Sequence, residues 1–473
     1  MFDASTYRSR RRTLIDREHP ESGLVLPLVV TDGHGLPVWE VVGERGHGVD
    51  RLGRRGAVDE VFAVPDRDRV VQRDGSAGVG LDPEGLEDVV WSGEHPSLRE
   101  VATAAGIDSV APVSDLEATL TTGREQGRAI HFLPPYRAEH RVRYESLLGI
   151  QNPRLDAFAS VPLIRAVVAQ RSVKSAEEIA QIEDALDWTA RLHEYAQRHA
   201  APGTSEQEIM GGLTGLLAAE GRTFSFNPTC SIHGEILHNH SYTNTLSEGD
   251  LFLVDAGAAS PLHYAGDITR VTPVGGPFSA RQRAIYEAVL AAQEAAIEAL
   301  APGVPFKDIH LLAARTLTEH LVDIGLMQGD PEEAVATGAH ALFFPHGLGH
   351  MMGLDVHDME SLGEDYVGYA DDQTRSEQFG LHTLRLARPL QPGFVATVEP
   401  GCYFISPLVE RWRSKGRHQS FINYDRVEDF LGLGGVRIED DVLITEDGAR
   451  VLGPALPKAP DAVEAQAGSA VHA

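Results

Sequence analysis

The chain has 473 residues, of which 42% are hydrophobic, and its formal net charge is −28. This length leaves room for two or three domains, and the hydrophobic share is that of a soluble globular protein. The acidity argues against a nucleic-acid partner, which would favour a basic surface.

The cysteines and the N-terminal residues indicate the cellular compartment of the protein. Only two cysteines occur, Cys230 and Cys402, and they predict no disulfide framework, which suits a reducing compartment. No apolar segment of about 7–15 residues follows the basic start of the chain, and no run of about 18 apolar residues occurs. We therefore expect a cytoplasmic protein with no signal peptide and no membrane partner.

Residues 1–160 predict an N-terminal α/β domain. Residues 1–30 indicate a short basic helix and then an apolar strand. Strand signals between 31 and 90 are short and broken by turns. Residues 96–106 indicate a helix, and residues 129–133 indicate a strand that ends at a Pro-Pro pair.

A long amphipathic helix marks the start of a second domain. Ser175 and Glu178 form a capping-box pattern, and apolar residues then recur at helical spacing. The helix is expected to end at Ala201-Pro202-Gly203, which is a helix-stop signal. The boundary between the two domains is therefore expected near residues 160–174.

The second domain contains an internal repeat. Ala-Pro-Gly at 201–203 recurs at 301–303, and each time a long helix precedes it and an amphipathic helix follows. Two such halves predict an α+β domain with pseudo-twofold symmetry over residues 161–457, in which helices cover a sheet. Residues 458–473 are rich in alanine and lack periodicity, so we expect a disordered tail there.

Four carboxylates lie in or beside apolar, strand-like runs. Asp255 and Glu399 occupy the same register of the two halves, and a later run in each half adds Asp267 and Glu439. A carboxylate within an apolar strand is costly unless it is paired or bound to a metal. A single one could be a satisfied buried polar group, whereas four of them favour metal binding.

A histidine-rich segment completes the candidate site. Residues 346–358 contain His346, His350 and His357 with glycines between them, which predicts loop and strand rather than a zinc-binding helix. Four carboxylates and one imidazole suit two divalent ions such as Mn²⁺, Co²⁺ or Zn²⁺. Two such ions can activate one water between them, which is the chemistry of hydrolysis.

These motifs resemble the "pita-bread" metallopeptidases. The branch that they resemble most contains Xaa-Pro aminopeptidase (aminopeptidase P) and Xaa-Pro dipeptidase (prolidase). Residues 31–90 are atypical, because they lack the aromatic-rich strands expected in that branch. The matching runs are Asp-Ala-Gly (255–257), Gly-Asp-Ile-Thr-Arg (266–270), the histidine-rich segment (346–358), Val-Glu-Pro-Gly (398–401) and Gly-Gly-Val-Arg-Ile-Glu-Asp-Asp (434–441).

The resemblance implies a role for each candidate ligand. Asp255 would bind one ion, His350 and Glu399 would bind the other, and Asp267 and Glu439 would bridge both. A hydroxide between the ions would attack the peptide bond that precedes a proline. Glu399 would also shuttle the proton.

Four residues are implied on the substrate side. His346 and His357 resemble a pair that holds the substrate and stabilises the oxyanion. His238 resembles an upstream histidine that faces the substrate. Arg437 resembles an arginine that orients the bridging carboxylate or meets the substrate.

The resemblance thus implies an Xaa-Pro aminopeptidase that acts on peptides with proline at the second position. Mn²⁺ is the first expectation for its two ions, with Co²⁺ or Zn²⁺ as alternatives, and a homo-oligomer, dimer or tetramer, is expected. A dipeptidase restricted to Xaa-Pro and a non-catalytic binding protein on the same scaffold remain as alternatives. A methionine aminopeptidase would lack the large N-terminal domain, and a creatinase-type hydrolase would lack the metal ligands.

Overall fold

The computed structural model describes most of the chain. Residues 116–470 are described without a gap. Before residue 116 the structure describes three single residues and six short strands: Thr6, Ser9, Val90, β1 (Gly23–Leu26), β2 (Val42–Gly43), β3 (Glu60–Val64), β4 (Arg69–Gln72), β5 (Val79–Gly80) and β6 (Ala111–Pro112).

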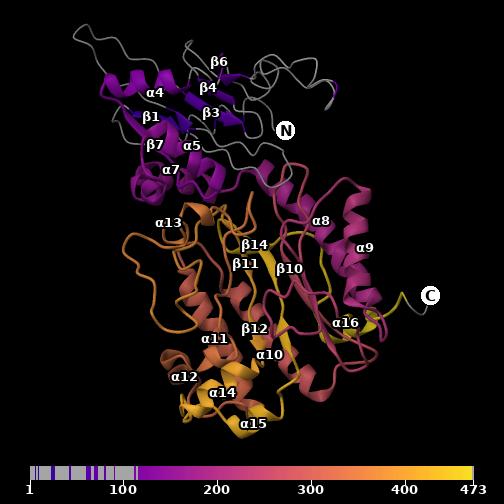
Figure 1. Ribbon diagram of the computed structural model, residues 1–473. Coiled ribbons are helices and arrows are strands. Elements are labelled where there is room, and N and C mark those ends of the chain that lie inside the picture. Colours follow the sequence, from indigo (N-terminus) through magenta and orange to yellow (C-terminus); the bar gives the residue numbers. More distant parts are fainter. Residues whose placement is uncertain are drawn as a thin grey trace. The chain divides into compact units, whose positions relative to one another are not determined.

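The chain divides into two compact units (Figure 1). The first unit comprises Met1–Arg171 with Ser361–Tyr366, and the second comprises Ser172–Glu360 with Val367–Ala473. The domain limit at residue 160 stays a prediction, and the compact units divide after Arg171, within the range 160–174 expected for the boundary. Three elements contain residues of both units: α7 (Val161–Ser172), η4 (Glu360–Leu362) and α13 (Glu364–Gly368).

The first unit combines short strands with helices. β1 pairs in parallel with β7 (Ala129–Phe132), so the strands predicted within residues 1–30 and at 129–133 are both present. Phe132 and Tyr144 are buried and pack edge to face, with ring centroids 5.4 Å apart. The helix predicted at 96–106 lies outside the described residues. The helices of this unit are α4 (Leu116–Glu125), α5 (Ala138–Leu148), η2 (Asn152–Arg154) and α6 (Leu155–Phe158).

The second unit is built from two similar halves, each with two long helices before a three-stranded antiparallel sheet (Figure 1). The sheets have the strand orders β10-β9-β8 and β11-β14-β15. A bridge between Thr269 and Glu439 joins the two sheets. The first half contains α8 (Ala176–His199), α9 (Glu206–Ala219), β8 (Thr229–Ser231), β9 (Leu251–Ala256) and β10 (Ile268–Pro273). The second half contains α10 (Ala280–Ala299), α11 (Phe306–Asp323), β11 (Val395–Val398), β14 (Asp440–Ile444) and β15 (Ala449–Val451).

Shorter elements complete this unit. They are α12 (Pro331–Thr337), η3 (Ala339–Leu342), β12 (Gly401–Tyr403), α14 (Ser406–Ser414), α15 (Tyr424–Glu428), β13 (Gly435–Arg437) and α16 (Pro460–Gln466). β12 and β13 pair as a separate antiparallel ladder. No helix in the described part of the chain is both long enough and apolar enough to cross a membrane.

The backbone repeats between the two halves. The N–H of Gly203 donates to the carbonyl of Leu246 at 2.8 Å, and the N–H of Gly303 donates to that of Leu390 at the same distance. Both glycines have positive φ, +92° and +83°, a conformation that glycine adopts without strain. This conformation explains why Ala-Pro-Gly ends a helix in each half, and the predicted pseudo-twofold α+β architecture is confirmed.

Strand alternation directs one side chain of β9 towards the site. Phe252 and Val254 are buried in the hydrophobic core with Leu213 and Leu217 of α9. Successive side chains of a strand point to opposite faces. Asp255 therefore points away from this core.

The predicted disordered tail is wrong for its described residues, 458–470. Residues 460–466 form α16, and Val463 of this helix is completely buried. Arg283 of α10 forms ion pairs with Asp461 at 2.7 Å and Glu464 at 2.9 Å. A short alanine-rich segment carries little pattern of its own, so packing against the rest of the unit decides its structure.

Candidate metal centre

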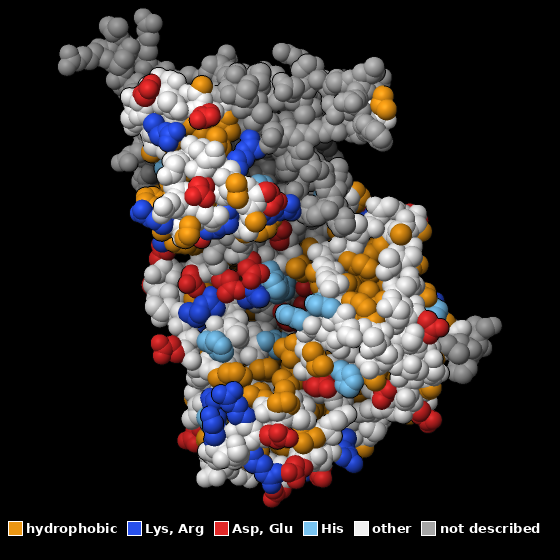
Figure 2. Space-filling view, viewed as in Figure 1, with side chains coloured by type: hydrophobic (Ala, Val, Ile, Leu, Met, Phe, Trp, Pro, Cys, Tyr) orange, Lys and Arg blue, Asp and Glu red, His pale blue; other side chains and the backbone are white. Residues whose placement is uncertain are grey.

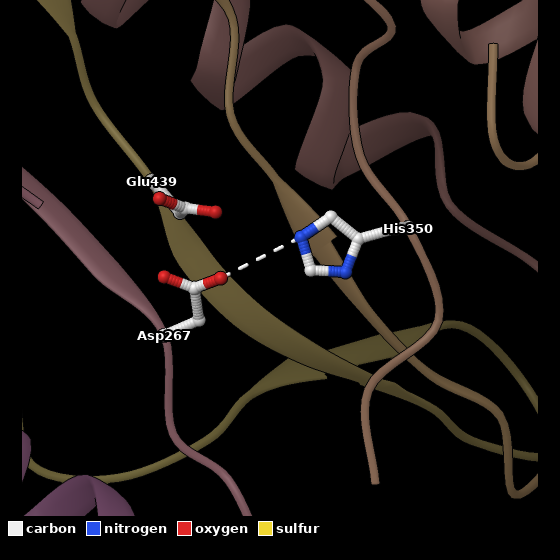
Figure 3. Close-up of side chains that lie close together, drawn as sticks. All are labelled: Asp267, His350 and Glu439. Carbon is white, nitrogen blue, oxygen red and sulfur yellow. Dashed lines mark ion pairs between the residues drawn. The ribbon is translucent and has the colours of Figure 1, made fainter. Parts of the chain in front are cut away.

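Three buried side chains from distant parts of the second unit meet in one place (Figure 3). Asp267 precedes β10, Glu439 precedes β14, and His350 lies in the loop that follows η3. One nitrogen or oxygen atom of each lies within 4.8 Å of those of the other two. His350 Nε2 is 3.5 Å from Asp267 Oδ2. These are three of the five ligands predicted from the sequence.

The other two predicted ligands line the same cavity. Glu399 directly follows β11, and its Oε1 lies 3.7 Å from His350 Nε2. Asp255 pairs with Thr269 in the β9–β10 ladder, and its Oδ2 accepts a hydrogen bond from Arg437 Nη2 at 2.5 Å. The structure therefore gathers all five predicted ligands around one cavity of about 350 Å³.

The hydrogen bond of His350 orients its imidazole for metal binding. Nδ1 lies 3.1 Å from the carbonyl oxygen of Met351. Because a carbonyl only accepts, Nδ1 carries the hydrogen and Nε2 of the neutral ring keeps its lone pair. Burial lowers the pKa of His350, which keeps the ring neutral. The lone pair thus faces the carboxylates of Asp267 and Glu399.

The carboxylates are destabilised by their own surroundings. Burial, and after it the Asp255 carboxylate, raises the pKa of Asp267 well above its usual value. Burial, and after it Asp267, does the same to the pKa of Glu439, and burial raises the pKa of Glu399 to about 7. Asp267 Oδ1 is buried with no hydrogen-bond partner among the described residues. Divalent cations would satisfy these oxygens, so the residues present fit a metal centre.

Hydrogen bonds hold the candidate ligands in place. Thr269 Oγ1 donates to Glu439 Oε2 at 2.6 Å, and the N–H of Asp267 donates to Asp441 Oδ2 at 3.1 Å. The N–H of His350 donates to Thr397 Oγ1 at 3.1 Å. Groups that orient ligands in this way matter nearly as much as the ligands themselves.

His346 is engaged at both ring nitrogens. Its Nδ1 lies 2.8 Å from the carbonyl of Gly347, so Nδ1 carries the hydrogen. Its Nε2 accepts a hydrogen bond from the hydroxyl of Tyr403 at 2.8 Å, and that hydroxyl accepts one from Arg437 Nη1 at 3.1 Å. Burial, and then the charge of Arg437, lowers the pKa of His346 to about 3.

His357 is fixed by a carboxylate. Its Nδ1 donates to Glu360 Oε2 at 2.8 Å, and its ring packs edge-on against His350 with centroids 4.4 Å apart. Burial, and then His350, lowers the pKa of His357 to about 3, so the ring is neutral and Nε2 keeps its lone pair. Glu360 also accepts a hydrogen bond from Arg385 at 2.5 Å.

The predicted substrate-side residues all line the cavity. Figure 2 shows histidine side chains gathered around a hollow on one face of the second unit. Burial, and then the charge of Arg437, lowers the pKa of His238. The histidine-rich segment, predicted as loop and strand, is a loop whose one bridge joins Met351 to Ala396, so the loop is present and the strand is not. The cavity lining includes all nine predicted site residues: His238, Asp255, Asp267, His346, His350, His357, Glu399, Arg437 and Glu439.

Sequence reasoning missed several groups that support this site. Tyr403 joins His346 to Arg437. Lys174 and Asp358 form a fully buried ion pair at 2.8 Å, with 1% of each side chain exposed. Each of these contacts joins residues far apart in the sequence. The capping box at Ser175, next to Lys174, could be predicted from the sequence. The ion pair could not, because no local sequence pattern indicates it.

A family model for metallopeptidase family M24 matches residues 180–446. The chain is 32% identical to the probable Xaa-Pro aminopeptidase pepP of Aspergillus fumigatus, over 82% of this chain and 81% of the relative. It is 33% identical to the probable Xaa-Pro aminopeptidase of Sordaria macrospora, over 81% of this chain and 79% of the relative.

Solved structures match over the whole length. Aminopeptidase PepP of Pseudomonas aeruginosa is 27% identical with a TM-score of 0.71, and the match covers 100% of this chain and 99% of that one. Aminopeptidase P of E. coli, solved with the inhibitor Pro-Leu, is 25% identical with a TM-score of 0.69, and the match covers 100% of both chains.

Proposed function

Because the chain belongs to metallopeptidase family M24, in its Xaa-Pro aminopeptidase branch, we propose that it is a metal-dependent exopeptidase. It hydrolyses the bond between the first residue of a peptide and a proline at the second position. The observation that carries this proposal is the convergence of the His350 lone pair with the buried carboxylates of Asp267 and Glu439.

The proposed metal centre uses five side chains. Asp255, Asp267, His350, Glu399 and Glu439 would together hold two divalent ions. Mn²⁺ is the proposed metal, with Co²⁺ or Zn²⁺ as alternatives that suit the same donor atoms. When bound, such a pair lowers the pKa of a water and polarises the carbonyl to be attacked.

Glu399 is the proposed proton carrier. Glu399 lines the cavity beside His350, and a carboxylate placed there can take a proton from a water and return it to a leaving group. Its Oε2 lies 4.0 Å from His346 Nδ1, at the edge of the cavity. Glu399 takes the proton of the attacking water and gives it to the nitrogen of the departing proline.

The substrate-side residues hold the peptide. We assign His238, His346 and His357 to substrate binding, and Arg437 to holding Asp255 through its 2.5 Å hydrogen bond. Donation to the oxyanion requires an exposed N–H. In this structure the N–H of His346 is engaged by the Gly347 carbonyl and that of His357 by Glu360, so each must exchange this partner for the substrate.

The test is hydrolysis of two peptides by Mn²⁺-loaded protein, Gly-Pro and Gly-Pro-Pro-Ala. Cleavage of the longer peptide, alone or with the dipeptide, supports the aminopeptidase, and cleavage of Gly-Pro alone identifies a dipeptidase. Gly-Ala-Pro-Ala, with proline at the third position, and a chelated sample are the controls. If the protein has metal bound and cleaves neither peptide, the result would contradict the proposal and favour a non-catalytic binding protein.

We also propose a homo-oligomer, a dimer or tetramer, in the cytoplasm. The oligomer rests on the family resemblance, and the compartment on two buried cysteines that are both free thiols. Size-exclusion chromatography with light scattering tests the assembly. A monomer at every practical concentration would contradict it.

A further inference from the structure

Glu206, the first residue of α9, is a completely buried carboxylate outside the metal centre. Its Oε1 accepts a hydrogen bond from the N–H of Ile232 at 2.9 Å. Its Oε2 accepts from the N–H of Asn244 at 3.1 Å and from Asn244 Nδ2 at 2.9 Å. No lysine or arginine in the described part of the chain forms an ion pair with it. Three N–H donors, of which Asn244 Nδ2 contacts both oxygens, therefore compensate its charge.

The two partners of Glu206 are the two ends of one loop. Residues 232–244, called here the cavity loop, contain no helix or strand. Leu237, His238 and His240 of this loop line the cavity. A segment without a backbone ladder of its own depends on anchors at its ends, and one carboxylate supplies an anchor to both ends.

The internal repeat shows that the fold itself does not require this carboxylate. Position 206 corresponds to position 306, because Ala-Pro-Gly at 201–203 recurs at 301–303. The N–H of Glu206 donates to the carbonyl of Asn244 at 3.0 Å, and the N–H of Phe306 donates to that of Arg388 at 3.0 Å. Phe306 is also completely buried. The same backbone position thus accepts an apolar side chain in the other half, where only the backbone N–H connects it to the segment opposite.

Burying a carboxylate without a cation is costly, so stability alone does not account for Glu206. Its geometry uses both oxygens as acceptors for three different N–H groups. A glutamine has one acceptor oxygen, and its amide hydrogens would face the N–H groups of Ile232 or Asn244. The site is therefore matched to an ionised carboxylate.

We propose that Glu206 is a positioning residue that fixes the cavity loop and thereby holds His238 at the substrate side of the cavity. This inference rests on the proposed function for its kinetic consequence. Its structural consequence, a loop that is rigid because of one carboxylate, can be measured without any substrate. Glu206 acts through the loop, because the hydrogen bonds of its carboxylate in the described part of the chain go to Ile232 and Asn244 and not to a candidate metal ligand.

The test compares Glu206→Gln with Glu208→Gln in the full-length, Mn²⁺-loaded protein. Glu208 lies in the same turn and closes the exposed capping box with Ser205, so its variant is a matched control for helix stability. In Glu206→Gln we expect the KM for Gly-Pro-Pro-Ala to rise by about tenfold or more, with a smaller change in kcat. Glu208→Gln should leave KM unchanged.

Hydrogen exchange measured by mass spectrometry supplies the second readout. Peptides covering residues 232–244 should exchange faster in Glu206→Gln and at the wild-type rate in Glu208→Gln, and the metal content should be equal in all three proteins. Wild-type KM and exchange in Glu206→Gln would overturn the inference. So would exchange that rises evenly across the second unit, because that would indicate a general stability effect.

A second variant keeps the inference testable if Glu206→Gln does not fold. Asn244→Ala removes the side-chain donor of the carboxylate and keeps the backbone N–H of position 244, so it should raise loop exchange and KM in the same direction and by less. An unchanged loop in Asn244→Ala would count against the role of Glu206. If the wild-type protein cleaves no Xaa-Pro peptide, the proposed function fails, whereas loop exchange still decides the role of Glu206.

Discussion

Hydrogen-bond direction decides what each residue of the candidate site can do. The carbonyl of Met351 leaves His350 with a lone pair that faces carboxylates, an arrangement that a divalent cation satisfies. The same reasoning shows that His346 and His357 have their N–H groups engaged. His350 differs from both because its Nε2 lies 3.5 Å from the Asp267 carboxylate and 3.7 Å from that of Glu399, which suits it to metal binding.

Replacing Glu399 by alanine should abolish hydrolysis and leave the fold intact. General acid–base groups contribute about a hundredfold or more to rate, so kcat with Gly-Pro-Pro-Ala should fall by at least that factor. Circular dichroism and thermal melting of the two metal-free proteins should match, because there the variant removes only one carboxylate from a cluster of like charges. The exposed Glu446→Ala serves as the control, and retained hydrolysis in Glu399→Ala would contradict the assigned role.

His340 should make the protein sensitive to acid. It is buried in η3, and burial lowers its pKa to about 4 from 6.5. Between pH 6.5 and 4 this imidazole is protonated in the unfolded chain and neutral in the folded chain. The free energy of unfolding is therefore unaffected by this group above pH 6.5 and decreases as the pH falls towards 4. The largest loss is on the order of 3 kcal/mol.

The variant His340→Leu should show this dependence directly. Its free energy of unfolding, measured by urea titration at pH 7.5 and at pH 5, should change less between the two values than that of the wild type. His382→Leu, at an exposed position, provides the comparison. An identical pH dependence in the wild type and His340→Leu would show that this imidazole does not contribute.

Individual elements hold the site through contacts at their ends. Lys174, two residues before α8, forms its buried ion pair with Asp358, which follows His357 in the cavity-lining loop. The N–H of Lys174 also donates to the carbonyl of Gly393 at 2.8 Å, just before β11. The start of one helix is thus connected to the segments that carry His357 and Glu399.

Lys174→Met should destabilise the second unit by about 3 kcal/mol, because it leaves the Asp358 carboxylate buried without its partner. Urea titration measures this loss. The double variant Lys174→Met/Asp358→Leu, which removes both charges, should recover part of it. A single variant as stable as the wild type would show that the pair contributes nothing, and a double variant that recovers nothing would show that packing rather than charge matters.

The whole molecule should depend on its metal. Five ligands come from segments spread between residues 255 and 439, so ions that bind them stabilise the folded state only. At a free metal concentration about a hundred times Kd, binding adds about 2.7 kcal/mol. Chelation should therefore lower the melting temperature and stop hydrolysis of Gly-Pro-Pro-Ala, and added Mn²⁺ should restore both.

Controls for this experiment use the same protein. Mg²⁺ at equal concentration tests for a general ionic effect, because its preference for octahedral oxygen ligands suits an imidazole-containing site poorly. A chelated protein that melts at the unchanged temperature would show that the centre is not occupied as purified. A melting temperature restored without activity would separate metal binding from the proposed hydrolysis.

The amino-acid sequence by itself determined the repeat and the set of candidate ligands. The Ala-Pro-Gly stops, the helical spacing after Ser175 and the carboxylates in apolar runs are local patterns, and local patterns are readable because they depend on neighbouring residues. The strands and helices that carry Asp255 and Glu399 followed from them.

Only the tertiary structure decided how these residues interact. Tyr403 between His346 and Arg437, Lys174 on Asp358, and the order of residues 460–466 all depend on contacts between segments far apart in the chain. Such contacts leave no periodicity or spacing in the sequence, because their geometry exists only once the helices and strands have packed. Glu206 is the clearest case: in the sequence it is one more acidic residue at the start of a helix, and burial between the two ends of a loop is what distinguishes it.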